Sequence, residues 1–315
     1  MQIEQIQQNT ELFDLLAEEQ EVSTKHHSML ALIRMRFMRN RLAVVGVGVL
    51  LVMVFMAIFA PVIIGETASV HPAIDTNLAN ALQGPSGAHI LGTDDVGRDE
   101  FARLLYGARV SMLVGFVSML VAMTLGIFIG SLAGFYGGLV DNILMRITDA
   151  FLAVPLYLIL FVISAFFIAG GSESIRQLIL LLGVFSWAIT ARIARGEILS
   201  LREREYVTAA RAQGIGNARI ILRHILPNAV GPLIVNATLL VGGNIITEST
   251  LSFFGFGVQP PDASWGNMLA AARDYISSAS ILVYAPGLAI LITVLSFNLI
   301  GDGLRDALDP YLTDK

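Results

Sequence analysis

The sequence predicts an all-α protein that crosses a membrane about six times, and two observations lead to this fold class. The first is composition: 55% of the 315 residues are hydrophobic, the mean hydropathy is +0.70, and only 14% are charged. That charged share is roughly half of what soluble proteins carry. The second is a series of apolar runs near the ~20 residues that a helix needs to cross a hydrocarbon core. The short alternating strands of a membrane β-barrel do not appear.

A polar tail is predicted over residues 1–41, ahead of the first apolar run. Residues 4–21 contain six acidic residues and no basic one, and the tail then becomes basic. The run at 42–64 is the first predicted transmembrane helix. It is not a cleavable signal peptide, because it is too long and about 40 polar residues precede it.

The rest of the chain alternates between loops and further apolar runs. In order, we predict an extracytoplasmic loop at 65–108, spans at about 110–135, 143–169, 177–191, 229–246 and 281–300, and a C-terminal tail at 302–315. Helices two to six define a transmembrane domain over 109–301. Pro155 and Asp149 lie near the start of the third span.

The fourth run has only 15 residues, and the distribution of charge decides whether it counts as a span. With six spans and a cytoplasmic N-terminus, 15 of the 20 lysines and arginines lie inside, including seven arginines within 192–223. Without the fourth span those seven would lie outside, against the tendency of basic residues to remain in the cytoplasm. We therefore predict that both termini and residues 192–228 are cytoplasmic.

Small residues repeat through the second span. Gly126, Gly130, Gly134 and Gly138 are spaced by four residues, which places them on one face of a helix. Small residues on one face let two helix backbones approach closely in lipid. Two interpretations stay open, namely packing within the chain and contact with a second membrane subunit.

Ionisable residues within the spans are few. Asp149 lies near the inner end of span three and Glu248 near the outer end of span five, where both are expected to reach water. Each has either a structural role or a role in substrate passage or gating. The scarcity of midplane charge and the lack of a filter motif argue against a proton-coupled carrier and a channel.

The chain shows no site for covalent chemistry. It has no phosphate-binding loop, no nucleophile–base arrangement, no cluster of metal ligands and no cysteine. The net charge of −5 offers no case for a nucleic-acid partner. We therefore expect no cofactor, no metal and no enzymatic activity.

A basic segment interrupts the apolar sequence. Residues 206–228 read YVTAARAQGIGNARIILRHILPN and predict two short helices within the cytoplasmic loop 196–228. Gly214 and Gly216 break the first helix, Asn217 is expected to cap the second, and Pro227 to end it. Such a segment either lies on anionic lipid or docks a soluble partner.

This segment resembles the EAA loop of type I ABC importer permeases. Ala209-Ala210, Gly214 and Leu226-Pro227 match that motif, while Thr208 replaces its glutamate and His224 a later isoleucine. These departures resemble the dipeptide, oligopeptide and nickel branch of the family. Similar stretches cover most of the chain after the first 40 residues, including LGTDDVGRDEFARLLYGAR, GFYGGLVDNILMRITDAFLAVP, LSFFGFGVQPPDASWGNML and PGLAILITVLSFNLIGDGLRDALDP.

The resemblance implies a multi-pass permease of the inner or plasma membrane, surrounded by lipid. It implies three kinds of protein partner: a second homologous permease, one or two ABC ATPase subunits that hydrolyse ATP, and an extracytoplasmic solute-binding protein. The loop would be the helix that couples to an ATPase. Its expected contact residues are Ala209, Ala210, Arg211, Gly214, Asn217, Arg219, Arg223, Leu226 and Pro227.

The substrate class implied by the resemblance is di- and oligopeptides, with nickel or another small solute as the alternative. Two alternatives of a different class remain, a secondary carrier or channel without an ATPase and a membrane scaffold that recruits a soluble partner. ATPase-dependent uptake distinguishes them.

Overall fold

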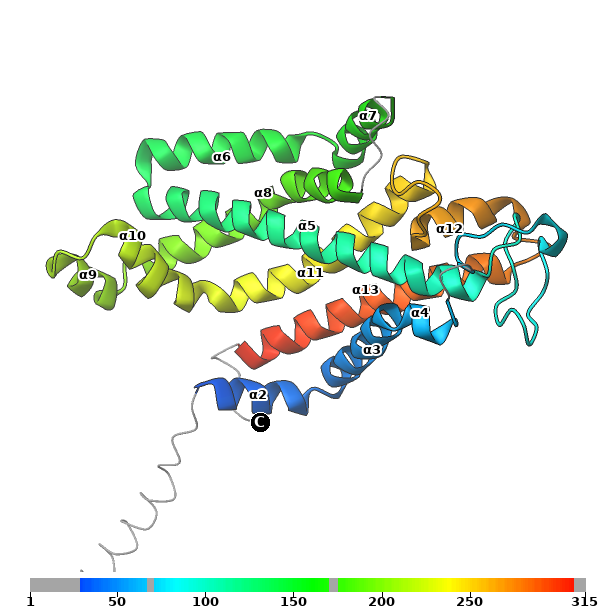
Figure 1. The fold of residues 1–315 in the computed structure, drawn as a ribbon. Coiled ribbons are helices and arrows are strands. Elements are labelled where there is room, and N and C mark those ends of the chain that lie inside the picture. The colour runs from blue at the N-terminus through cyan, green and yellow to red at the C-terminus, as the bar shows by residue number, and fades with distance from the viewer. Residues whose placement is uncertain (1–28, 67–70, 170–174, 309–315) are drawn as a thin grey trace, which may run out of the picture.

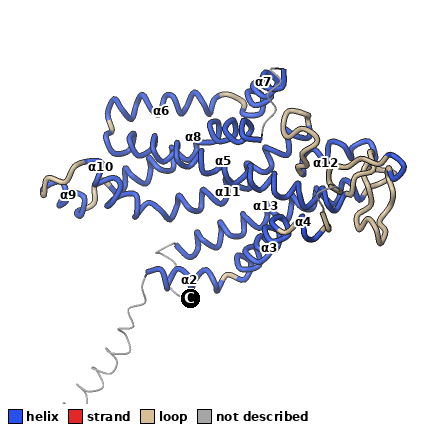
Figure 2. The backbone as a smooth tube through the Cα atoms, viewed as in Figure 1, coloured by secondary structure: helices blue, strands red, loops and turns tan. Residues whose placement is uncertain are grey.

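The computed structural model describes residues 29–66, 71–169 and 175–308. Within these ranges the chain is helical and has no strand, only an isolated bridge between Thr93 and Asp99 (Figure 2). The predicted all-α fold class is confirmed. Of the predicted tails at 1–41 and 302–315, residues 1–28 and 309–315 lie outside the described residues.

Long helices run lengthwise through the molecule (Figure 1). Five are long and apolar enough to cross a membrane, and a bent pair, α6 and α7, would make a sixth. The long helices are α3 (Arg41–Ile58), α5 (Glu100–Tyr136), α8 (Ile175–Leu201), α11 (Leu226–Phe253) and α13 (Ile281–Leu308), and the bent pair is α6 (Gly138–Ala153) and α7 (Leu156–Ala169). The shorter helices are α2 (Met29–Arg39), α4 (Ala60–Ile63), α9 (Glu205–Ala212), α10 (Asn217–Ile220) and α12 (Trp265–Ala272), with tighter or wider turns η1 (Leu78–Asn80), η2 (Ile221–Ile225) and η3 (Arg273–Tyr275).

The fourth apolar run is a full-length helix. α8 has 27 residues, because helix continues beyond the apolar stretch through Arg192 and Arg195. It runs in the same direction as α5: Ser118 contacts Ile179, and Gly134 lies against Ile198 further along both helices. Two successive helices with the same direction need a return path between them. The α6–α7 pair provides it, so the chain passes six times along the bundle.

The third predicted span is not one straight helix. α6 and α7 meet at an angle of 81°. Pro155 explains the break, since its ring disfavours a helical conformation in the residue before it and it has no N–H to donate. Val154 accordingly takes an extended conformation at the end of α6.

Several other boundaries differ from the predicted ones. α5 begins at Glu100, so helix replaces the end of the predicted loop 65–108. Asp99 starts it by accepting a hydrogen bond from the backbone N–H of Ala102 at 2.8 Å. At the N-terminal side, α2 forms within the predicted polar tail. At the other end α13 extends to Leu308 rather than stopping near 300.

Glycines bring α5 and α8 into close contact. A β-carbon added at Gly126 would lie 2.8 Å from the carbonyl oxygen of Trp187, and one at Gly134 would lie 2.9 Å from that of Arg195. Gly130 has similar contacts with Ala194. These three glycines therefore pack against α8 of the same chain.

Gly138 does not belong to this row. α5 ends at Tyr136, and Gly138 is already the first residue of α6; Gly137 and Gly138 have φ of +65° and +54°. Nothing lies within 4 Å of a β-carbon at Gly138. The four-residue spacing continued by coincidence past the end of the helix.

The two ends of the bundle differ in character. α9 and α10 lie at one end, near which α13 ends, and α12 lies at the other with the loop between α4 and α5 (Figure 1). We refer to residues 204–228 as the basic segment and to residues 71–99 as the polar lobe. These are the two candidate sites for contact with partners.

Candidate functional site

The basic segment is a folded part of the molecule with its own apolar core. Val207 and Ala210 of α9 are buried, as are three isoleucines of the turns that follow. They pack on the ends of α5 and α8 in one cluster: Phe135, Ile198, Val207, Ala210, Ile220, Ile221 and Ile225. The segment is therefore packed directly against two long helices.

The turn between α9 and α10 depends on Gly214. Its φ is +75°, a left-handed conformation that favours glycine. The turn is closed by backbone hydrogen bonds from Gly214 N–H to the carbonyl of Arg211 and from Ile215 N–H to that of Ala210. This arrangement is typical of a helix C-terminus that satisfies its last carbonyl groups.

The residue that caps α10 is not the predicted one. Gly216 is the N-cap, and Asn217 is the first residue of the helix, with no side-chain capping bond. The prediction was wrong by one position, because both residues favour helix starts and only the backbone geometry distinguishes them.

Pro227 does not end a helix either. Helix continues from Asn217 to Phe253. Residues Ile221–Ile225 form a π-helical turn, in which the N–H of Leu226 bonds the carbonyl of Ile221. A wider turn accommodates a proline that lacks an N–H, and the side chain of Asn228 satisfies the carbonyl of His224 at 2.7 Å.

The predicted contact residues of the basic segment divide into inward and outward groups. Ala210 is buried, and the guanidinium of Arg211 lies over the Phe135 ring, 5.2 Å from its centre. Ala209, Arg219 and Arg223 are exposed. Arg211 is exposed as well, so the free surface of the segment combines a small side chain with three basic ones.

Other arginines attach α8 to its neighbours beneath the basic segment. Arg195 donates two hydrogen bonds to the carboxylate of Asp141 on α6, at 2.5 and 2.6 Å. Arg202 donates to the carbonyl of Gly134 at 2.8 Å. Such bidentate and backbone contacts hold α6 and α5 in register with α8.

Asp149 forms an ion pair with Arg192 at 2.6 Å. Both side chains are about half exposed on the single chain. Glu248 is different: it is fully buried, so the expectation that it reaches water was wrong. Of these two acids, only Asp149 is open to a solute in this conformation.

Glu248 accepts hydrogen bonds from three serines. Ser111 of α5 donates at 2.8 Å, Ser252 at 2.7 Å and Ser249 at 3.4 Å. Two of these hydroxyl oxygens in turn accept from backbone N–H groups, Ser111 from Trp265 and Ser252 from Val258. Glu248 thus connects α5, α11, α12 and the loop before α12.

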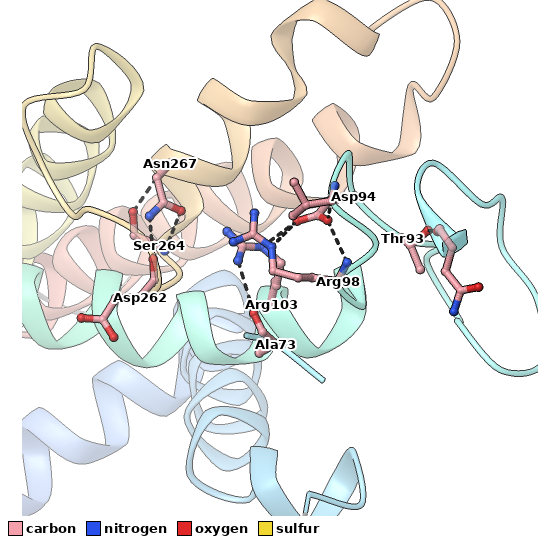
Figure 3. Close-up of polar contacts among 10 residues, drawn as sticks. Ala73, Thr93, Asp94, Arg98, Arg103, Asp262, Ser264 and Asn267 are labelled. Atoms are coloured by element: carbon pink, nitrogen blue, oxygen red, sulfur yellow. Dashed lines mark hydrogen bonds and ion pairs between the residues drawn. The ribbon is translucent and has the colours of Figure 1, made fainter. Parts of the chain in front are cut away.

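The polar lobe is organised by a buried aspartate. Asp94 pairs with Arg98 at 2.7 Å and with Arg103 at 3.5 Å, and Arg103 also donates to the carbonyl of Ala73 (Figure 3). Asp94 and Arg103 are both buried. Because a buried charge needs its partners, these contacts bind the lobe tightly to the start of α5.

Backbone pairing stiffens the rest of the lobe. Thr93 N–H donates to the carbonyl of Gln83, and Gln83 N–H donates to the hydroxyl oxygen of Thr93. Leu82 N–H donates to the carbonyl of Asp94. This framework presents large apolar side chains to solvent: Ile74, Leu78, Leu82 and Ile90. Leu78 is 75% exposed, and Leu82 has an unusual φ of +57°. Exposed apolar groups on a rigid scaffold are typical of a protein-binding surface.

Comparison with known protein families decides what kind of molecule this is. Residues 126–314 match the family described as the inner membrane component of binding-protein-dependent transport systems. The chain belongs to this family. Residues 28–85 also match the N-terminal transmembrane domain of oligopeptide transport permease C.

Relatives of this transport-system component are permeases. The chain is 43% identical to the dipeptide transport system permease protein DppC of Alkalihalophilus pseudofirmus, over 87% of both chains. It is 39% identical to the oligopeptide transport system permease protein OppC of Bacillus subtilis, over 93% of both. It is 40% identical to the glutathione transport system permease protein GsiD of Pectobacterium atrosepticum, over 88% of this chain and 89% of that one.

Sequence reasoning did not single out Asp94 and Arg103, the buried ion pair of the polar lobe. Asp94 and Arg103 lie in the quoted stretch LGTDDVGRDEFARLLYGAR, but nothing local distinguishes them from exposed charges. The pattern Glu248–Ser252 places two polar groups one helical turn apart within an apolar span, and that signal was available. Within the described residues no group of three or more potential ligands could hold a metal ion.

Proposed function

We propose that this permease forms half of the translocation pathway of an ATP-driven importer of short peptides. The observation that carries the proposal is the extent of its similarity to relatives named for dipeptide and oligopeptide transport, which covers nearly the whole chain. The glutathione permease adds support, because glutathione is itself a short peptide. A second, homologous permease supplies the other half.

The basic segment is the element that docks on an ATPase subunit. Its apolar core on α5 and α8 supports this role, because motion of the segment moves those helices. Exposed Ala209 permits close approach, and Arg219 and Arg223 offer charge to acidic side chains. The chain has no phosphate-binding loop, so ATP is hydrolysed in the partner subunits.

The two ends then face opposite sides of the membrane. The basic segment and both termini lie in the cytoplasm, in agreement with the excess of basic residues there. The polar lobe lies outside, where its exposed apolar residues receive the solute-binding protein. Asp149, exposed beside Arg192, faces the substrate pathway.

Reconstituted transport tests the function directly. The chain is placed in proteoliposomes with the homologous permease, the ATPases and the binding protein from its own genome. Uptake of a radiolabelled dipeptide is expected only with ATP and the binding protein present. Uptake driven by a proton gradient without ATPases would instead identify a secondary carrier.

Docking on the ATPase is tested by adding bulk at an exposed alanine. Ala209→Trp is expected to abolish copurification of the ATPases, because the side chain prevents close approach. Ala88→Trp in the polar lobe is the matched control and is expected to retain them, since Ala88 is exposed at the far end. Equal recovery with both variants would refute docking through this surface.

A further inference from the structure

The short helix α2 lies outside the spans and carries an unusual share of arginines. It covers Met29–Arg39 and joins α3 through a break at Asn40. Arg34, Arg36 and Arg39 belong to it, and Arg41 begins α3. The chain contains only 20 lysines and arginines in 315 residues, so four arginines within eight positions is a marked concentration.

α2 is held in a fixed position by its inner face. The Phe37 ring lies against Gly303 of α13. Asn40 accepts a hydrogen bond from Ala43 N–H at 3.2 Å and donates one to Asp306 at 3.3 Å. Because the end of α13 anchors it, α2 keeps one face outward.

The outward face combines apolar and basic side chains. Met35 and Met38 are 57% and 60% exposed, and Arg34, Arg39 and Arg41 are exposed around them. The apolar stripe does not end at the break. It continues into the exposed residues of α3, beginning with Leu42 and Val45.

This continuity indicates what covers the face. α3 is long and apolar enough to cross a membrane, where exposed apolar side chains would contact hydrocarbon. An apolar stripe that leaves the span and becomes flanked by arginines has reached the level of the lipid headgroups. Methionines there contact the upper acyl chains, and guanidinium groups match phosphate oxygens in charge and geometry.

We propose that α2 is an interfacial helix that binds the headgroups of anionic phospholipids through Arg34, Arg39 and Arg41. The bound lipid anchors the first span and, through Phe37 and Asn40, the end of α13. This interaction is independent of the substrate and of the ATPase.

Native mass spectrometry of the full-length chain in mild detergent tests the proposal. The probes are phosphatidylglycerol and phosphatidylcholine, titrated separately. The wild-type chain is expected to bind phosphatidylglycerol more tightly. Arg34→Gln/Arg39→Gln/Arg41→Gln should lose that preference, at about fivefold in affinity per arginine, while the affinity for phosphatidylcholine stays unchanged.

Two further variants make the result specific. Arg211→Gln/Arg219→Gln/Arg223→Gln removes the same charge at the same end of the molecule and is expected to retain the preference. Replacing Arg34, Arg39 and Arg41 by lysine should preserve most of it and also shows that the site tolerates substitution. If both glutamine variants lose the preference equally, the effect is one of net charge and the proposal fails.

The acidic stretch at residues 4–21 is the competing occupant of this face. A wild-type chain without any preference for phosphatidylglycerol would overturn the lipid proposal. If neutralising the six acids of that stretch then created a preference that depends on the three arginines, the face would be covered by the chain itself.

Discussion

The hydrogen bonds around Glu248 have a fixed direction. Trp265 N–H and Val258 N–H donate to the oxygens of Ser111 and Ser252, so the hydroxyl hydrogens of both serines are left for the carboxylate. A carboxylate accepts a hydrogen bond from each serine hydroxyl, whereas an amide has a donor group in place of one of the two acceptor oxygens. The directions of these hydrogen bonds therefore explain why an acid, and not an amide, is buried at position 248.

Glu248→Gln is expected to loosen the loop before α12 without unfolding the bundle. The new amide directs a donor at one serine, at a cost of about 1–3 kcal/mol. Hydrogen–deuterium exchange over residues 254–265 should increase. Glu203→Gln, at an exposed acid, is the control and should leave exchange unchanged. Unaltered exchange in both variants would show that the loop does not depend on this carboxylate.

Gly130 is a second residue where a small change is expected to have a large effect, because an added β-carbon would disturb the contact between α5 and α8. A β-carbon there would lie 2.7 Å from that of Ala194. Gly130→Ala should therefore force α5 and α8 apart and destabilise the chain by about 1–3 kcal/mol. Gly196 lies on α8, and nothing lies within 4 Å of a β-carbon added there. Gly196→Ala should therefore be neutral or stabilising. The midpoint of thermal aggregation in detergent measures both, and an equal midpoint would contradict the close contact.

At the scale of elements, prolines shape two helices in opposite ways. Pro155 breaks the third span, because Val154 before it takes an extended conformation and ends α6. Pro227 instead lies inside continuous helix, where a π-helical turn absorbs the missing hydrogen bond. Ile225 before Pro227 and Ala229 after it are both buried.

The turn of the basic segment gives a prediction at this scale. Gly214→Ala is expected to strain the left-handed turn by about 1–2 kcal/mol. Trypsin should then cleave at Arg211 and Arg219 several-fold faster. Gly216→Ala is the matched control, because Gly216 has an ordinary φ of −65° and free space. Equal cleavage of the two variants would remove Gly214 from its structural role.

At the scale of the whole molecule, six passes place the polar lobe and the basic segment at opposite ends. The chain has no cysteine, so single cysteines report sidedness without background. In whole cells whose inner membrane is intact, Ser86→Cys should react with an impermeant maleimide. Arg305→Cys should react only after the membrane is opened, since both positions are exposed but lie at different ends. The reverse pattern would invert the orientation.

The sequence by itself determined the class of the molecule. The length and hydropathy of a span are local properties, so the all-α fold and the number of passes were predictable, and the motifs that resemble ABC permeases led to the right family. The fourth span was also predicted, and α8 is long and apolar enough to be one. This prediction was possible because the distribution of basic residues is a property of the whole sequence and not of one contact.

Only the tertiary structure decided which residues face each other. Glu248 looked like an acid near water, yet serines and a loop distant in sequence enclose it. Gly138 continued the four-residue spacing of the glycines in α5, but it lies beyond the end of that helix at Tyr136. Pro227 looked like the end of a helix, yet the helix continues through it. Where a helix ends or continues is decided by backbone geometry, as at Tyr136 and Pro227. Burial and hydrogen bonding depend on the neighbouring helix, as at Glu248, and local sequence does not specify that neighbour.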